Sequence, residues 1–495
     1  MSERLTYRFG PLERRGILGG VRAGQAASLA IGVLLAVTAV DAAPTGAGVL
    51  VAALALAVAL VVAVAPIGRR TLNEWAPIVT GFALRRFAGD WRSPLPTAGM
   101  RARVGAGPQR PIDDAAPVPP AELRGVRILA GDYRGRAIGI LSDRRGRWLT
   151  AVLACRVVAF SLLDTEAQER RLARWGLVLS GAGGAGIRRI QWLERTAPAQ
   201  GDELVRWLHA ERDPAVPARG TPMIESYLEL IGTTAQVTQE HEILVAIQLD
   251  AQRIPGRGAT ATVSGVVERT ERIARGLEAA EVSVLGALTP GQLGRWLRTA
   301  FDPYARAELA ALQAADPGRE ELAEANAWPL GEHDAWDHYR TDGALHATFW
   351  IGSWPRIDVS PMFMDALLGR SSAVRTVAVT FEPIAPERSV REIEAAVTRD
   401  RADRELRHRF GQSETARQRQ AQNATIRREA ELAAGHCEVR LSGFVTVSGR
   451  DLDDLRRAVA EVSEHAARAR LELHRMYGQQ AAAFTFTLPL CRGLR

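Results

Sequence analysis

The sequence contains no lysine, and all 63 of its basic residues are arginine. Together with abundant alanine and glycine, this bias is typical of the GC-rich codon usage of an actinobacterium, and it indicates nothing about mechanism. The formal net charge of +7 is modest for a chain of 495 residues. Such a charge suits the anionic inner leaflet of a membrane as well as it suits nucleic acid. Direct nucleic-acid binding would be supported by the arginine content alone, and we do not expect it.

Paired cysteines are also absent. Cys155, Cys437 and Cys491 lie far apart in the chain and form no CxxC motif, which argues against a zinc ribbon and against a disulfide framework. We therefore expect reduced thiols in a cytoplasmic domain.

Motifs for catalysis are missing as well, because the chain contains neither GxSxG nor HExxH. The glycine run at 181–186 is followed by no GK[ST] and precedes a predicted strand, so it predicts no nucleotide site. Asp451 stands at a predicted helix start, where a carboxylate serves as the cap. One group of imidazoles and carboxylates matches no common metal spacing and is interpreted as a surface loop: His333, Asp334, Asp337, His338 and His346. We predict no catalytic, cofactor-binding or metal-binding residue, and we expect that the chain is not an enzyme.

Two long uncharged runs near the N-terminus differ from the otherwise ordinary soluble composition. Residues 23–40 and 42–68 carry no charge over about 18 and about 27 positions, and about 20 residues span a bilayer core. Five arginines precede the first run, none lies within 41–48, and four more follow the second run by position 86. By the positive-inside rule, this pattern predicts a hairpin of two transmembrane helices in the cytoplasmic (inner) membrane, with both chain ends in the cytoplasm.

Aromatic and basic side chains are interleaved directly after the hairpin, in the remainder of a first unit that spans 1–92. The pattern predicts a helix in the headgroup region, although a juxtamembrane helix packed against protein fits it nearly as well. The expected membrane-interface residues are Trp75, Phe82, Arg85, Arg86, Phe87 and Trp91. Residues 93–121 are rich in proline and predict an extended linker.

The remaining chain predicts a cytoplasmic α+β part in three sections. Residues 122–383 alternate short apolar strands with helices, as in α/β or α+β domains. Residues 384–435 are dense in arginine, glutamate and glutamine, and they predict a long charged helical arm. Residues 436–495 predict a strand, a helix and two further strands, the last at 482–488. With a strand at 374–381, this C-terminal unit predicts a split ferredoxin-like arrangement.

Two stretches resemble components of secretion machinery. The sequence YRFGPLERRGILGGVRAGQ at 7–25, followed by the double span, resembles the PrgI family of conjugative elements, which are inner-membrane subunits of type IV secretion systems. The segments GFVTVSGRDLDDL at 443–455 and QQAAAFTFTLPL at 479–490 resemble the N-terminal domain of the large type IV secretion ATPase. No Walker motif follows, so the resemblance implies a non-catalytic adaptor that docks a separate RecA-like ATPase onto the bilayer and needs no cofactor.

The resemblance also implies where the ATPase would bind. In the ATPase family the end of this segment continues into the motor, so a separate motor would need a non-covalent contact there. We expect an exposed docking surface in a larger, homo-oligomeric complex, with Phe484, Phe486, Arg492 and Arg495 as its residues. The alternative, in which this tail merely closes the sheet, stays open.

A rival resemblance is to the EccE family of type VII secretion, which likewise has two N-terminal spans and a cytoplasmic α/β domain. The strands around 139–158 and 189–195 fit that family. We favour type IV because the closing segment is the more specific signal. A membrane-tethered glycosyltransferase-like enzyme, the third alternative, would need an acidic metal or nucleotide site that the sequence does not provide.

The charge asymmetry generates a prediction about topology. A reporter fused after Arg92 is expected to lie in the cytoplasm, because the flanking arginines keep both hairpin ends there. A fusion within 41–48 is the matched control and is expected outside. A periplasmic signal from the fusion after Arg92 would show that the predicted orientation is wrong.

Overall fold

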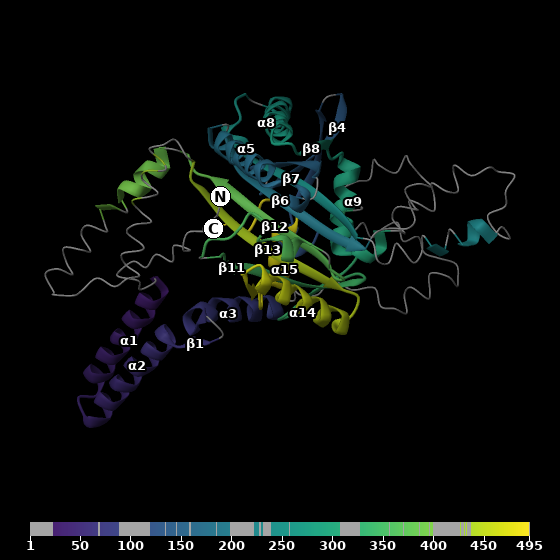
Figure 1. The fold of residues 1–495 in the computed structure, drawn as a ribbon. Coiled ribbons are helices and arrows are strands. Elements are labelled where there is room, and N and C mark those ends of the chain that lie inside the picture. The colour runs from purple at the N-terminus through teal and green to yellow at the C-terminus, as the bar shows by residue number, and fades with distance from the viewer. Residues whose placement is uncertain are drawn as a thin grey trace.

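A computed structural model of the chain describes residues 23–88, 119–198, 239–306, 327–398 and 437–494, with gaps at 68, 69, 134, 145, 158, 159, 185, 257, 356, 370, 386 and 396; it also describes 222–226, 229, 230, 426, 430 and 432. Most of the predicted linker, residues 93–118, and most of the predicted arm lie outside the described residues. In the described part, a helical hairpin projects from a large sheet covered by helices (Figure 1). The predicted order, two apolar helices and then an α+β domain, is confirmed at this level.

The hairpin consists of α1 (Ala23–Ala42) and α2 (Gly46–Val64). Both helices are long and apolar enough to cross a membrane. Small residues of α2 are buried against the neighbouring helix, among them Ala52 and Ala59, whereas large side chains such as Leu50 (69% exposed) point outward. Small residues inside and large apolar residues outside are typical of helices packed together in lipid.

A short two-stranded turn, β1 (Pro66–Ile67) with β2 (Arg70–Thr71), connects the hairpin to α3 (Leu72–Ala88). The α3 helix leaves the hairpin at an angle and runs along the sheet domain (Figure 1). It therefore lies between the two apolar helices and the rest of the protein.

Twelve strands of the described chain form one antiparallel sheet in the order β3-β4-β5-β7-β6-β12-β13-β11-β10-β9, with β8 beside β5 and β14 beside β11. The strands are β3 (Arg127–Tyr133), β4 (Arg136–Asp143), β5 (Trp148–Arg156), β6 (Ile187–Pro198), β7 (Gln239–Asp250), β8 (Ser283–Ala287), β9 (Glu332–Asp334), β10 (Tyr339–Thr341), β11 (Ala344–Ser353), β12 (Val374–Pro383), β13 (Val439–Gly449) and β14 (Glu472–Arg475). Successive side chains point to opposite faces, so both faces carry a core.

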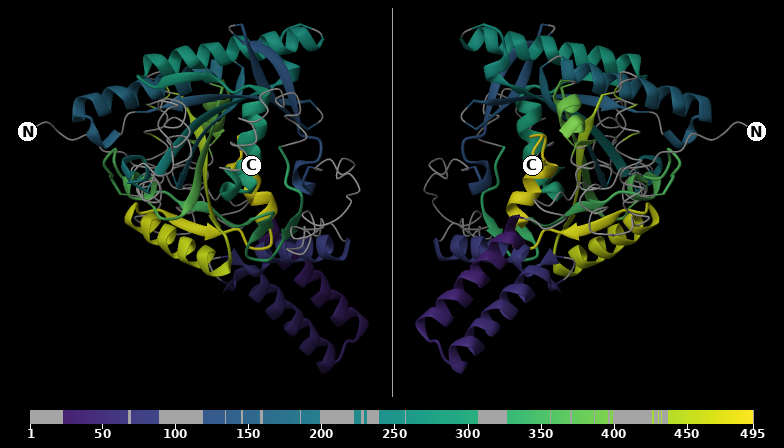
Figure 2. Two further views of the ribbon diagram at one scale, coloured as in Figure 1. Left: turned by 90° about the vertical axis from the view of Figure 1, so that its right-hand side faces the viewer. Right: turned by 90° about the vertical axis from the view of Figure 1, so that its left-hand side faces the viewer.

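Helices cover the two faces differently. The outer face carries α5 (Thr165–Gly184) and α8 (Ala259–Ala279) on one half, and α11 (Asp365–Leu368) and α14 (Leu452–Arg468) on the other. The inner face carries α9 (Pro290–Phe301) and α15 (Gln480–Phe484). Figure 2 shows α8 and α14 outside the two halves of the curved sheet, with the C-terminal segment inside the curve.

The two halves of the sheet repeat one order of elements. In the first half, β5-α5-β6-β7-α8-β8 arrange their strands as β8-β5-β7-β6. In the second half, β11-α11-β12-β13-α14-β14 arrange theirs as β14-β11-β13-β12. A hairpin, β3-β4 or β9-β10, precedes each set, and α9 or α15 follows it. The halves join where β6 pairs antiparallel with β12, from Thr196↔Arg375 to Ile190↔Phe381.

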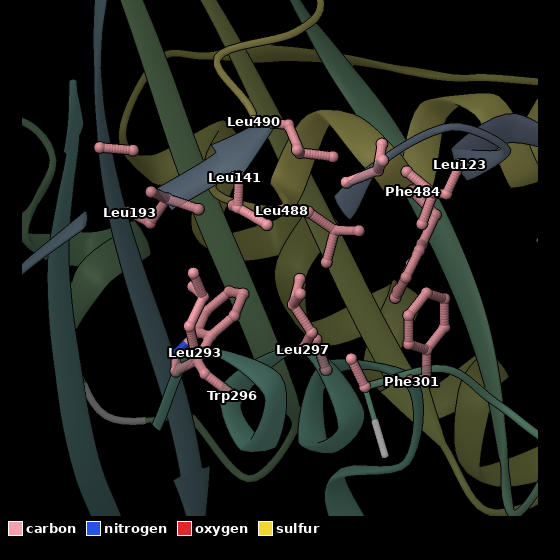
Figure 3. Packing of buried hydrophobic residues seen from close by; sticks show 14 of the residues in the cluster. Leu123, Leu141, Leu193, Leu293, Trp296, Leu297, Phe301, Phe484, Leu488 and Leu490 are labelled. Carbon is pink, nitrogen blue, oxygen red and sulfur yellow. The ribbon is translucent and has the colours of Figure 1, made fainter. Parts of the chain in front are cut away.

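The inner core belongs to both halves. Leu193 of β6, Leu293 and Leu297 of α9, Ala378 of β12 and Phe484 of α15 lie in one buried cluster. Figure 3 shows Leu297 and Phe301 of α9 directed toward Leu488 and Phe484 across this core. The C-terminal residues are therefore part of the interior of the sheet domain.

The predicted strand at 482–488 is wrong. The segment forms α15 and then a 3₁₀-helix, Thr485–Thr487. The alternation of phenylalanine and threonine suggested a strand, but the hydroxyl of Thr485 donates to the carbonyl of Ala482, and that of Thr487 to the carbonyl of Phe484. These bonds satisfy helical carbonyls. The strand that completes the C-terminal half is β11, which the sequence assigned to the preceding section, 122–383.

Tight packing at the start of α14 generates a stability prediction. A Cβ at Gly449 would lie 2.4 Å from the backbone nitrogen of Leu455, and backbone cannot move aside as a flexible side chain can. We expect Gly449→Ala to lower the free energy of unfolding by about 1–3 kcal/mol. The matched control is Gly176→Ala in α5, where a Cβ meets nothing within 4 Å and where alanine stabilises a helix by about 0.5–1 kcal/mol. Equal urea midpoints for both variants would contradict this account.

Candidate functional site at the base of the hairpin

An aromatic cluster fastens α3 to the sheet domain. Trp75 stacks on Trp336 with ring centroids 6.0 Å apart, and Phe82 meets the same indole edge-on at 5.2 Å. The Tyr477 ring lies 6.3 Å from both tryptophan rings, stacked on Trp336 and tilted against Trp75. Contacts of this kind contribute about 0.5–1.5 kcal/mol per pair beyond the buried area. We refer to Trp75, Phe82, Trp336 and Tyr477 as the aromatic cluster.

Arg85 adds a directional contact one turn further along α3. Its guanidinium donates to the carbonyl of Gly478 and lies 3.7 Å from the carboxylate of Asp334. The same carboxylate accepts the N–H of Ala481, and burial raises the pKa of Asp334 to about 6. Gly478 has φ +67°, and a Cβ there would lie 2.6 Å from the Trp336 ring, so only glycine fits this close approach.

The structure divides the expected membrane-interface residues into two groups. Trp75, Phe82 and Arg85 contact the sheet domain, as the packed-helix alternative describes. Phe87 is 89% exposed and Arg86 is exposed beside it, whereas Trp91 lies outside the described residues. The last turn of α3 therefore exposes one aromatic and one basic side chain, as expected of a helix at a membrane surface.

Buried amides hold the C-terminal segment, residues 479–494, across the inner face of the sheet. The Gln191 amide donates to the carbonyl of Phe486 at 2.7 Å and accepts the N–H of Cys491 at 2.9 Å. The Gln248 amide donates to the carbonyl of Leu490 at 2.8 Å. Gln191 and Gln248 are 0% and 2% exposed, so unpaired amides here would be costly. Neither glutamine was predicted from the sequence. For Gln248 the available signal was a polar residue after the apolar run 243–247 of β7, whereas β6 contains several other polar residues and gave no such signal for Gln191.

Three of the four expected docking residues, Phe484, Phe486 and Arg492, belong to this C-terminal segment. Phe484 is 2% exposed, so the expectation that it lies on an open surface is wrong. Arg492 donates to the Asp143 carboxylate at 2.8 Å and to the carbonyl of Glu122 at 2.8 Å. Phe486 stays partly exposed, and Arg495 lies outside the described residues. The segment closes the sheet, as the alternative interpretation held; whether it also binds a partner stays a prediction.

A cleft of about 1500 Å³ lies between the base of the hairpin and one end of the sheet. Gln25 of α1 and Asn73 of α3 line it at the hairpin. Its sheet side is aromatic and basic, with Trp148, Trp350, Trp354, Phe444, Phe486, Arg144, Arg188 and Arg492. The cleft is therefore an open space that both the hairpin and the C-terminal segment border.

The arginines at this end of the sheet are unequally neutralised. Arg189 pairs with Glu382 at 2.7 Å and Arg492 with Asp143 at 2.8 Å. Arg188 lies 4.0 Å over the Trp148 ring and donates to the Gln248 carbonyl oxygen, a neutral acceptor. Burial, and then the charge of Arg189, lower the pKa of Arg188. Among the described residues, no carboxylate forms an ion pair with Arg188.

Groups that could support catalysis have structural roles in the described part of the chain. No group of three His, Cys, Asp or Glu there could hold a metal ion. His346 is fully buried and bonds to Ser448 and the carbonyl of Phe301, and burial lowers its pKa to about 4. Burial raises the pKa of the Cys155 and Cys491 thiols to about 12, which leaves them protonated and unreactive. Asp451 caps α14 through the N–H groups of residues 453 and 454.

His346 and Asp334 generate a prediction about acid stability. The folded state holds the pKa of His346 below its usual 6.5, so the unfolded chain binds the proton first and stability is lost as pH falls from about 6.5 to about 4. Asp334 has the opposite sign, because its raised pKa favours proton uptake in the fold between about 6 and 3.8. Relative to the natural protein, we expect His346→Gln to lose less stability between pH 7 and 4.5, and Asp334→Asn to lose more, each by about 2 kcal/mol.

Urea unfolding of the detergent-solubilised protein at the two pH values measures this difference. Each variant is compared with itself, so a general loss of stability cancels. The same pH dependence in all three proteins would contradict the assignment.

No family model matches the sequence, and no curated protein matches it. Function has to be inferred from the geometry above and from the resemblances in the sequence.

Proposed function

We propose that this protein is a non-catalytic component of the cytoplasmic membrane that anchors and docks a separate RecA-like ATPase of a type IV secretion or conjugation apparatus. The observation that carries the proposal is the junction at α3. The aromatic cluster and Arg85 fix the sheet domain to a hairpin long and apolar enough to cross a membrane. A domain attached in this way keeps one face toward the bilayer, as an anchor for a motor requires.

We infer further that each half of the sheet is a ferredoxin-like unit. A β-α-β-β-α-β chain with its fourth strand beside its first, and its second at the far side of the third, is that arrangement. The strand orders β8-β5-β7-β6 and β14-β11-β13-β12 follow it. Two such units joined through β6 and β12 would form a broad platform, suited to contacts with an ATPase and with further copies of the chain.

The partner contact on this platform needs residues that are accessible in the folded state. Phe486 is the member of the expected docking set that stays partly exposed without an ion pair of its own, packed against Phe444 at 4.8 Å. Phe484 and Arg492 would then act indirectly, because they hold the segment that presents Phe486. The proposal therefore assigns the contact to Phe486.

Recovery of partners from native membranes tests the proposal. The intact protein is expected to retain a RecA-like ATPase, and Phe486→Ser is expected to reduce the recovery at least about tenfold, as for a central interface aromatic. Leu177→Ser on α5 is the matched control, because Leu177 is 69% exposed on the outer face. If Phe486→Ser retains the ATPase in full, Phe486 is not the contact. If the intact protein retains no such ATPase, the adaptor proposal is wrong.

A structural component of a type VII secretion complex, resembling EccE, is the second candidate. It is favoured by β4, β5 and β6, which contain the segments that fit that family and which all belong to one sheet, none of them as its edge strand. Recovery of type VII components in place of a type IV ATPase, in the same experiment, would decide for it.

A further inference from the structure

The cleft at the base of the hairpin has the composition of a site for an anionic group. Four arginines and three carboxylates are its charged lining residues within the described chain: Arg144, Arg188, Arg189, Arg492, Glu74, Glu122 and Asp143. The carboxylate of Asp143 already serves Arg492, and that of Glu74 accepts the N–H of Thr71 at the start of α3. The positive charge at the sheet end of the cleft is therefore in excess.

This excess is concentrated on two side chains. Arg188 stacks on Trp148 and, within the described part of the chain, donates a side-chain hydrogen bond only to the neutral Gln248 amide. Arg144 is exposed at the mouth of the cleft, makes no ion pair with a described residue, and lies close enough to lower the pKa of Arg188. The Glu382 carboxylate, which pairs with Arg189, offsets these effects on the pKa of Arg188 only in part. A partly buried guanidinium in such surroundings is stabilised by a further anion. The fixed fork of a guanidinium matches a phosphate group.

The position of the cleft indicates where the phosphate comes from. Gly24 and Gln25, at the start of α1, and Thr71, just after α2, line the same space as Arg188. If the hairpin crosses the bilayer, these residues lie at its cytoplasmic surface, where phospholipid headgroups are located. Trp350 and Trp354 also line the cleft, and tryptophan is enriched at the headgroup level.

We propose that the cleft binds the phosphate of an anionic phospholipid headgroup, held by Arg188 and Arg144 beside the Trp148 ring. The lipid attaches the sheet end of the cleft to the membrane surface, in addition to the attachment made by the aromatic cluster. This inference rests on the membrane insertion of the proposed function. It does not require the ATPase contact assigned to Phe486, although Phe486 lines the same cleft.

Native mass spectrometry of the full-length protein in detergent tests the site. We expect phosphatidylglycerol to bind at least about tenfold more tightly than phosphatidylcholine, because only the former carries a net negative charge. The double variant Arg144→Gln/Arg188→Gln is expected to lose this preference. Arg456→Gln is the control, since Arg456 is exposed on α14, far from the cleft lining. An unchanged preference in the double variant would overturn the proposal.

Two further probes distinguish the source of the phosphate. Inorganic phosphate that competes fully at the concentration of the lipid would show that the site holds a free anion rather than a lipid. An oligo-dT strand that binds more tightly than the lipid, and loses its binding in the double variant, would assign the cleft to nucleic acid and overturn the lipid proposal. ATPase recovery from membranes is a separate readout, so its failure would refute the adaptor role without touching this site.

Discussion

The antiparallel pairing of β6 with β12 is the interaction on which the rest of the structure depends. It joins two halves that each have their own outer core. It makes one continuous sheet from segments far apart in the chain, such as Ile190 and Phe381, which are 191 positions apart. The inner core exists only because of this pairing, since Leu193 and Ala378 supply it from opposite halves. Without the β6–β12 pairing, α9 and α15 would each pack only against the inner face of their own half of the sheet.

The C-terminal segment follows from the same joint. Gln191 lies on β6 and Gln248 on β7, and together they bind the segment at three backbone positions, while the Thr446 hydroxyl of β13 meets that of Thr487 at 2.8 Å. Contacts from both halves converge on one strip of chain. Buried amides contribute little net free energy when they are paired but cost a great deal when they are not. These hydrogen bonds therefore favour a single path for the C-terminal segment, and they stabilise the β6–β12 pairing on the inner face of the sheet.

The features that the sequence predicted are those with local signals. Two uncharged runs are sufficient to identify the hairpin, and alternating apolar residues locate strands such as β5 and β12. The repeat of the two halves has no such signal, because equal strand orders arise from long-range pairing and not from similar sequences. The strand predicted at 482–488 failed for a related reason. Alternation of period two does not show whether hydroxyls such as that of Thr485 bond to a neighbouring carbonyl or face a partner strand.

The candidate site was predictable only in part. Aromatic and basic residues after the hairpin pointed to α3, but Trp75 meets Trp336 and Tyr477 across more than 250 positions of sequence, and no local pattern encodes that contact. The same pattern fits a membrane surface, because amphipathic side chains suit both environments. Gln191 and Gln248 were missed because an isolated glutamine in a strand is compatible with an edge facing solvent. Arg188 follows the glycine run at 181–186, which predicted no nucleotide site, and only the folded structure shows its place over Trp148.

The junction also has a mechanical consequence. Gly478, which accepts the hydrogen bond of Arg85, stands two residues before α15, and the Gln480 side chain in the first turn of that helix accepts the N–H of Thr348 on β11. A rotation of α3 would have to break the Arg85 bond or displace Gly478. Since a Cβ-sized change at Gly478 already meets the Trp336 ring, this point has almost no freedom. Consecutive contacts therefore connect the hairpin, through α3, to the start of the C-terminal segment and to the inner core that both halves share.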